Sequence, residues 1–416
     1  MNGGQILNMR YCFIIDTPYQ LFCVLNIVHA FKKNERRNDN IYDLYIGTNF
    51  NKAHKILENV KNEQIFDHVY KFNCERGEVR TGVFLRYLLK LVTVSRNERK
   101  LLECTARKYS RKVITKLFVS KRFLSVGQMA FGKKYNLDMP YDRLFASYFN
   151  PFVRNMALLS PNAEICCFED GNGSYSENMF DFANKHEPDK KLAVAGIDIE
   201  KLRPKKLYVF KPEMCQLDRE FKIRKLPLFY KTNREFTRIT NQIFDYKKPS
   251  LYNGAKIIFL MTRDDEISIL GGTGHGGECL QRYKEAVELL AHQDKDIIYR
   301  IHPRQKVYDI GEKTVDCTGV MWELLTPDCI TDDCIIVSVC STGAMSPKIL
   351  YGIEPYVIMI GKYVYTGTEE EMAVTKMIDN FKKFYSNEKK LIDIRSKEQL
   401  INCIKKILKK DMNEKN

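Results

Sequence analysis

Long apolar runs are missing from this 416-residue chain. No run approaches the roughly 18 to 20 residues that a membrane-spanning helix needs. Near the N-terminus the apolar run covers only residues 11–15 and ends at Asp16 and Pro18, which is typical of a first strand and not of a signal peptide. We therefore expect neither secretion nor a membrane-spanning segment.

A cysteine framework is also missing. The thirteen cysteines are scattered from Cys12 to Cys403 at irregular spacing, and no C-x-x-C pair occurs beside a second one. This pattern argues against a disulfide scaffold and against a structural zinc site. We expect reduced thiols in a cytoplasmic protein.

Positive charge is abundant and clustered. The formal net charge is +15, and residues 86–122 carry twelve Lys or Arg against two Glu. Near the C-terminus, Ile401, Ile404 and Leu408 share one helical face among lysines. Such segments suit an anionic membrane surface, an acidic glycan or nucleic acid, and equally a solvated helix face. Nucleic acid is the least favoured, because the basic segment lacks the Gly-aromatic signature of RNA-binding modules.

Short apolar runs alternate with helical stretches in both halves, which predicts an α/β fold with parallel sheets. The expected domains are residues 1–188 with a basic helical insertion at about 80–134, a connecting region at 189–252, a second domain at 253–385, and a basic C-terminal helix or tail at 386–416. Ligands of open α/β sheets bind beyond the carboxyl ends of the strands. The polar motifs described next fall at such strand ends.

The first motif, FEDGNG, places Glu169, Asp170 and Gly171 after a predicted strand. A calcium loop would need glycine at its sixth position and glutamate at its twelfth, where this chain has Tyr175 and Asp181. The motif is either a plain turn or a pair of carboxylates that orient a hydroxyl or take its proton.

Two motifs of the second half could hold an anion. In IHPRQ, His302 and Arg304 follow a strand and can both donate to phosphate oxygens, although a strand-end histidine bonded to the backbone is an equal alternative. In SVCSTGAMS, Ser341, Thr342 and Gly343 lie where a strand passes into a helix, as a phosphate site or simply as a helix N-cap.

A third motif of the second half, FLMTRDDE, ends the first strand there with Asp264 and Asp265. Five glycines follow within residues 271–277, at a spacing that matches neither a P-loop nor a dinucleotide fingerprint. That glycine-rich segment is either a mobile loop over a ligand or a plain connection.

Taken in order, FEDGNG, IHPRQ and SVCSTGAMS resemble the bacterial sialyltransferases of glycosyltransferase family 52, which cap lipooligosaccharide or capsule. TPYQ after the first strand and FLMTRDDE fit the same likeness, which covers about half the chain. The resemblance implies a GT-B fold, in which two Rossmann-like domains face a cleft. It also implies an inverting transfer from CMP-sialic acid without metal or other cofactor, to a terminal galactose of a surface glycan, with an alpha-2,3 linkage. Peripheral contact with the anionic inner face of the membrane and a homodimer are further expectations.

The resemblance implies roles for individual residues. Asp264 takes the position of the general base, and the related polysialyltransferases place that base at the position of Glu169. His302 would donate to the leaving phosphate. Asp170 is a further catalytic candidate. The donor-binding candidates are Gly171, Arg304, Ser341, Thr342 and Gly343. Thr17 and Gln20 are candidates for the acceptor side or a loop.

Three alternatives stay open. One is a related GT-B transferase that uses another nucleotide sugar, and another is a polysialyltransferase. A third, from a different class, is a non-catalytic protein that binds polyanions or membranes through its basic segment.

Overall fold

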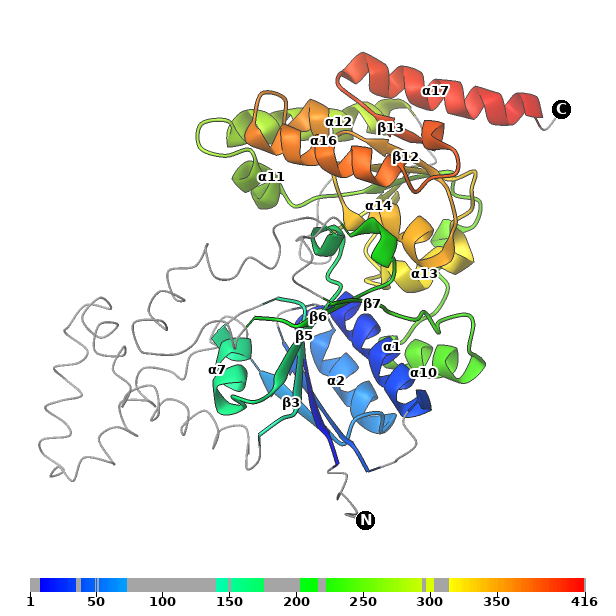
Figure 1. The fold of residues 1–416 in the computed structure, drawn as a ribbon. Helices are drawn as coiled ribbons and strands as arrows, with labels where there is room; N and C mark the ends of the chain where they lie inside the picture. Colours follow the sequence, from blue (N-terminus) through cyan, green and yellow to red (C-terminus); the bar gives the residue numbers. More distant parts are fainter. Residues whose placement is uncertain are drawn as a thin grey trace, which may run out of the picture. The chain divides into compact units, whose positions relative to one another are not determined.

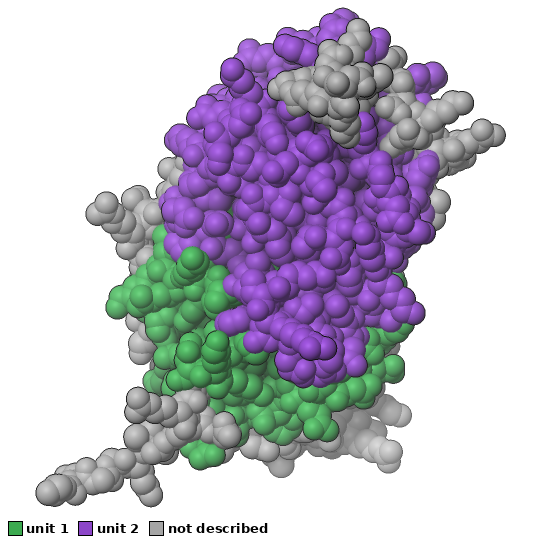
Figure 2. Space-filling view, turned by 90° about the vertical axis from the view of Figure 1, so that its right-hand side faces the viewer, with its two compact units in different colours: residues 1–209, 217–227 green, residues 210–216, 228–416 purple. Residues whose placement is uncertain are grey.

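The computed structural model describes residues 8–34, 39–48, 50, 52–72, 140–148, 151–175, 203–215, 222–293, 297–302 and 314–414 (Figure 1). The chain divides into two compact units. The first comprises Met1–Val209 and Leu217–Pro227, and the second comprises Phe210–Gln216 and Leu228–Asn416 (Figure 2).

The first unit is built on a seven-stranded parallel sheet in the order β3-β2-β1-β4-β5-β6-β7. This is the Rossmann order, in which the chain reverses direction across the sheet between β1 and β4. The strands are β1 Arg10–Ile15, β2 Ile41–Gly47, β3 His68–Phe72, β4 Arg143–Ala146, β5 Glu164–Phe168, β6 Lys206–Val209 and β7 Lys222–Lys225.

Burial explains why the inner strands, such as β1 and β2, read as mostly apolar runs. In β1, residues 11–15 are all buried, as expected for a parallel strand covered on both faces. Helix α1 (Pro18–Asn34) packs against β1 and β5, and Pro18 suits its first position because that N–H has no partner within a helix. Helix α2 (Ala53–Asn62) packs against β2 and β3, and α7 (Pro151–Leu159) packs against β4.

The second unit repeats the arrangement with a six-stranded parallel sheet in the order β10-β9-β8-β11-β12-β13. The reversal now lies between β8 and β11. The strands are β8 Ile257–Leu260, β9 Ile297–Arg300, β10 Thr314–Asp316, β11 Ile335–Ser338, β12 Tyr356–Met359 and β13 Leu391–Asp393. The helices are α10 Arg234–Phe244, α11 Asp264–Leu270, α12 Gly276–Gln293, α13 Trp322–Cys329, α14 Thr342–Ser346, α15 Gly361–Val364, α16 Glu369–Lys382 and α17 Lys397–Glu414.

Two Rossmann-like units in one chain form a two-domain α/β architecture of GT-B type, and the predicted fold class is confirmed. Residues 189–252, expected as a connecting region, contribute β6 and β7 to the first sheet and α10 to the second unit. The basic insertion at about 80–134 lies outside the described residues.

The C-terminal helix α17 buries its apolar face. Leu400, Ile404 and Ile407 are buried, and the helix packs against α12. In the described part of α17 the apolar stripe therefore stabilises the second unit. Across the described ranges, no helix combines the length and the apolar character needed to cross a bilayer.

Candidate functional site

Strand register in the second unit collects three of the predicted motifs at one edge of the sheet. Leu260, the last residue of β8, is aligned with Arg300 of β9 on one side and with Ser338 of β11 on the other. His302 follows two residues after Arg300, Asp264 four residues after Leu260, and Ser341 three residues after Ser338. All three therefore lie beyond the carboxyl edge, where the strand order reverses and where such sheets bind ligands.

The two neighbouring aspartates after β8 are in different situations. Asp265 is paired with Arg263, whose hydrogen bond lowers the pKa of the Asp265 carboxyl. Asp264 begins α11, with its Oδ2 3.7 Å from Nζ of Lys284 on α12. The Asp264 Oδ1 is buried and has no hydrogen-bond partner among the described residues. Asp264 thus lacks the arginine partner of Asp265, and its side chain is 31% exposed.

The SVCSTG motif forms a helix start directly after β11. Ser341 is the N-cap of α14, and its Oγ accepts a hydrogen bond from the backbone N–H of Gly343 at 3.2 Å. Its own N–H donates to Oγ of Ser338 at 2.9 Å. Burial raises the pKa of the preceding Cys340 thiol to about 12, so Cys340 is a neutral thiol at physiological pH and not a nucleophile.

Gly343 permits close packing at this helix start. A Cβ at this position would lie 3.2 Å from Cδ1 of Leu260 and 3.4 Å from Cδ1 of Trp322. The Gly343 carbonyl also accepts a hydrogen bond from the indole N–H of Trp322 at 2.6 Å. The segment that carries Ser341 and Thr342 is therefore held against the end of β8.

The strand that leads to His302 ends in a buried ion pair that was not identified from the sequence. The Arg300 guanidinium pairs with Asp316 of β10 and donates to the hydroxyl of Tyr252 at 3.1 Å. Its centre lies 5.3 Å from the ring of Trp322. Burial acts to raise the pKa of Asp316, but Arg300 and the neighbouring donors outweigh it and hold that pKa below its usual value. One signal was available, since Arg300 is the one charged residue in the run IIYRI.

His302 is half-buried at the end of this strand. Arg304, the other predicted anion-binding residue of the IHPRQ motif, lies outside the described residues.

In the first unit, the structure brings together TPYQ and FEDGNG, which are 150 residues apart. The Gln20 amide is buried, and its Nε2 donates to Oδ1 of Asp170 at 3.0 Å. The Gln20 Oε1 accepts a hydrogen bond from the backbone N–H of Asp16 at 2.7 Å. The backbone N–H of Gln20 donates to Oγ1 of Thr17 at 3.2 Å. Thr17, Gln20 and Asp170 therefore form one hydrogen-bonded group at the carboxyl edge of the first sheet.

Glu169 points into the interior of the first unit. Its carboxylate is fully buried and accepts hydrogen bonds from the hydroxyls of Tyr19, at 2.5 Å, and Tyr175. A substrate hydroxyl cannot reach Glu169 in this arrangement, whereas Asp170 is only half-buried. Gly171 adopts φ 98°, a conformation that favours glycine, and so turns the chain directly after the two carboxylates.

Further polar side chains at this edge were not identified from the sequence. The hydroxyl of Tyr148 donates to Oδ2 of Asp16, while Asp16 Oδ1 and Ser147 Oγ are buried without a hydrogen-bond partner among the described residues. They border a crevice, also lined by Gln20, that is too narrow for a water molecule. The available signal was the polar residue directly after each strand, Asp16 after β1 and Ser147 after β4.

No three His, Cys, Asp or Glu side chains within the described ranges are grouped so that they could hold a metal ion. The predicted site residues that the structure describes thus form two sets. The first unit holds Thr17, Gln20, Glu169, Asp170 and Gly171, and the second holds Asp264, His302, Ser341, Thr342 and Gly343.

No family model and no curated protein matches the chain. Among solved structures it is similar to a UDP-GlcNAc 2-epimerase of Methanocaldococcus jannaschii, with 13% identity over 96% of this chain and 93% of that chain and a TM-score of 0.46. A sialyltransferase of Photobacterium damsela has 12% identity over 94% of this chain and 82% of its own, with a TM-score of 0.44.

The glycosyltransferase SnogD of Streptomyces nogalater has 9% identity over 91% of this chain and 96% of its own, with a TM-score of 0.40. Likenesses this distant carry no argument about activity. Membership of glycosyltransferase family 52 stays a prediction.

Proposed function

We propose that this protein is an inverting sialyltransferase that transfers sialic acid from CMP-sialic acid to a terminal galactose of a bacterial surface glycan. One observation carries the proposal. The register of β8, β9 and β11 collects Asp264, His302 and the Ser341–Thr342 helix start at the reversal point of one Rossmann-type sheet. A carboxylate, an imidazole and an anion-binding helix start are the groups that transfer from a nucleotide sugar requires.

The chemistry is a single displacement. The acceptor hydroxyl oxygen forms a bond to the anomeric carbon, while the bond from that carbon to the phosphate oxygen breaks and its electron pair leaves with CMP. Asp264 takes the hydroxyl proton, because its side chain is 31% exposed at the edge of the sheet. His302 donates a proton to the departing phosphate, and the hydroxyls of Ser341 and Thr342 stabilise its charge.

The first unit has a positioning role in this proposal. Asp170, held by the Gln20 amide, is the half-buried carboxylate of its edge and would accept hydrogen bonds from sugar hydroxyls. Glu169 acts from the interior by fixing Tyr19 and Tyr175. The base is therefore assigned to Asp264 and not to Glu169.

The proposed location is the inner face of the membrane, where lipid-linked acceptors are presented. Because the apolar face of α17 is buried, its described part would contact the membrane by charge alone, through exposed residues such as Lys405 and Lys406. Such contact is sensitive to salt.

A related transferase that uses another nucleotide sugar is the second candidate, because phosphate binding at Ser341–Gly343 is common to all nucleotide-sugar donors. Testing a panel of nucleotide sugars for hydrolysis and transfer distinguishes the two.

The test is transfer of sialic acid from CMP-sialic acid to lactose in the presence of EDTA. The release of CMP and the formation of sialyllactose are measured. We expect product from the wild type and a loss of about 10²- to 10⁴-fold in His302→Ala. His292→Ala removes an exposed histidine near the end of α12 and serves as the matched control. No CMP release by the wild type would reject the proposal, and full activity of His302→Ala would reject the assigned role.

A further inference from the structure

Lys284 is a cation that lies beside the proposed base. Its Nζ is 3.7 Å from Oδ2 of Asp264, which is too long for a hydrogen bond, and Asp264 is its one carboxylate partner among the described residues. The Lys284 side chain is 48% exposed. Its ammonium group is therefore accessible, and no described residue accepts a hydrogen bond from it.

The backbone holds Lys284 in this position. Helix α11 begins at Asp264 and packs against α12, which carries Lys284. One residue earlier on α12, the hydroxyl of Tyr283 accepts a hydrogen bond from the backbone N–H of Thr262 at 3.0 Å. The ring of Tyr283 also lies 6.2 Å from that of Phe259 in β8. These contacts tie α12 to the end of β8, so the lysine stays next to Asp264 even when its side chain turns to a ligand.

The arginines around the site are engaged by other groups of the chain. Arg263 pairs with Asp265, and Arg300 pairs with the buried Asp316. Arg282 donates to backbone carbonyls at the end of α15. Each of these guanidinium groups thus has a structural contact that a ligand would have to displace.

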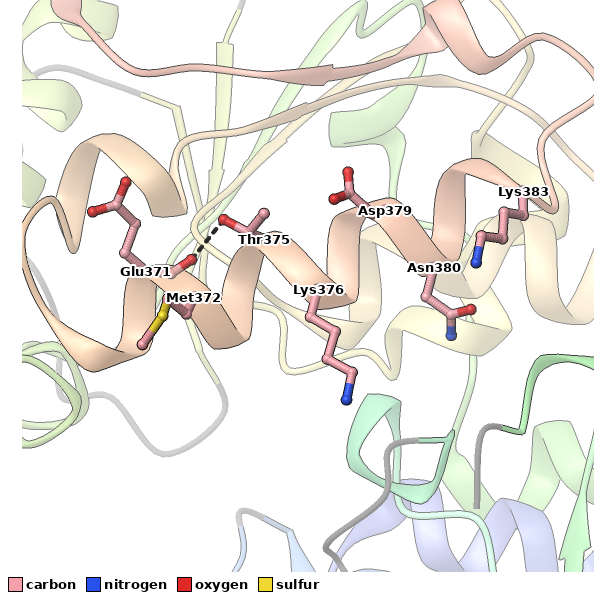
Figure 3. A pocket seen from close by; sticks show the side chains of 7 residues that line it. All are labelled: Glu371, Met372, Thr375, Lys376, Asp379, Asn380 and Lys383. Atoms are coloured by element: carbon pink, nitrogen blue, oxygen red, sulfur yellow. Dashed lines mark hydrogen bonds between the residues drawn. The ribbon is translucent and has the colours of Figure 1, made fainter. Parts of the chain in front are cut away.

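Other lysines of the second unit have different surroundings. Lys362 is buried and pairs with Asp393. Lys376 and Lys383 line an open surface formed by α16 and the residue after it, and no candidate site residue belongs to that surface (Figure 3). Of the lysines in the described ion pairs, Lys284 is the one whose partner is a candidate site residue.

The chemistry of the proposed donor calls for a cation at this position. In CMP-sialic acid, one anomeric carbon carries both the sugar carboxylate and the bond to phosphate. The base has to reach the acceptor hydroxyl that attacks this carbon, so Asp264 and the donor carboxylate come close together. Two carboxylates repel each other, and more strongly where protein replaces water around them. A cation beside both carboxylates replaces this repulsion with attraction.

We propose that the ammonium group of Lys284 binds the carboxylate of the donor sugar next to Asp264, and that it makes the site selective for acidic sugars. The inference rests on the proposed function and deepens it, because it names the group that distinguishes sialic acid from a neutral sugar. A hydrogen bond between charged groups should strengthen binding of the donor about 10- to 100-fold.

The experiment measures donor binding without turnover, by calorimetric titration. The probes are CMP, CMP-3-fluorosialic acid and the methyl ester of the latter, which lacks the carboxylate charge. The fluorine disfavours the positive charge that develops during transfer, so the donor stays intact. The test variant is Lys284→Met, and Lys284→Arg keeps the charge. The matched control is Lys256→Met, which removes an exposed lysine next to the amino end of β8.

We expect the wild type and the control to bind the acid about 10- to 100-fold more tightly than its ester. Lys284→Met should bind acid and ester alike, with its affinity for CMP unchanged. Lys284→Arg should retain most of the preference for the acid.

Three results would overturn the inference. A wild type that binds acid and ester alike shows that the carboxylate is not recognised, and a Lys284→Met variant that keeps the preference shows that another group recognises it. An equal loss for all three probes shows that Lys284 binds the phosphate or supports the fold. In each of these cases the nucleotide site still stands. If the wild type binds neither CMP nor the fluorinated donor, the proposed function fails and this inference fails with it.

Discussion

Replacing Arg300 with methionine should strongly destabilise the second unit, because it leaves the buried carboxylate of Asp316 without its cation. The Asp316 side chain is 1% exposed and the Arg300 side chain 11% exposed. Removing one partner of a buried ion pair costs about 3 to 5 kcal/mol. The hydrogen bond to the Val320 carbonyl and the contact with the Trp322 ring are lost as well. We expect a loss of about 4 kcal/mol in the free energy of unfolding.

The assay is urea unfolding followed by tryptophan fluorescence. Trp322 is the single tryptophan of the sequence, so its fluorescence reports unfolding of the second unit. The unfolding of that unit can then be analysed as one transition, separately from the first unit. With a urea dependence of about 2 kcal/mol per molar, the midpoint should fall by about 2 M. Arg238→Met removes an exposed arginine that pairs with Glu235, and as the control it should change the free energy of unfolding by less than about 0.5 kcal/mol.

The same variant should acquire a pH dependence. In the wild type the pKa of Asp316 is lowered, so its stabilising contribution is present above the unfolded pKa of about 3.9 and is lost only as pH falls through the lower folded pKa. In Arg300→Met the burial that raises this pKa is no longer opposed by the guanidinium. The folded carboxyl then binds its proton more tightly than the unfolded one, and stability falls as pH rises above about 4.

Lowering the pH from 7 to 5 should therefore raise the urea midpoint of Arg300→Met, with no recovery from this pair in the wild type. A midpoint shift below about 0.5 M at pH 7 would show that Asp316 does not depend on Arg300. A large shift without recovery at pH 5 would show that the loss comes from packing and not from the unpaired charge.

Three further outcomes are expected. Asp264→Asn should lower transfer by about 10²- to 10⁴-fold, whereas Asp265→Asn should have little effect, and equal losses would contradict the separate assignment of the two aspartates. Gly361→Ala should cost at least about 2 kcal/mol in thermal or urea unfolding, because its Cβ would lie 2.6 Å from the Val339 carbonyl oxygen, while Gly277→Ala meets nothing within 4 Å and should be neutral or stabilising. Finally, the purified protein should sediment with anionic vesicles at low salt and be released at high salt, and binding to neutral vesicles alone would refute the electrostatic contact.

Local sequence patterns were sufficient to predict the fold class and the places of the motifs. Runs such as residues 11–15 and 335–339 are apolar or nearly so because parallel strands are covered on both faces, and that property depends on near neighbours in the chain. Polar residues and glycine directly after such runs predicted the ends of the strands. The motifs FEDGNG, FLMTRDDE, IHPRQ and SVCSTGAMS could thus be assigned to strand ends from residue patterns alone.

The state of each site residue depended on contacts that the sequence does not encode locally. Glu169 and Asp170 are adjacent in the chain, yet Tyr19 engages one and Gln20 the other from 150 residues away. Asp264 and Asp265 are also adjacent, yet it is Asp264 that lies 3.7 Å from Lys284, twenty residues along the chain on α12.

Composition and periodicity thus determined that the chain forms two α/β halves with ligand-binding strand ends. This was possible because a strand that is buried on both faces can be recognised from its own apolar residues. Only the tertiary structure decided that Leu260 lies between Arg300 and Ser338, that Glu169 is enclosed, and that the apolar face of α17 is packed against α12. Strand order and side-chain accessibility are set by long-range packing, in which each residue's partners come from distant segments of the chain.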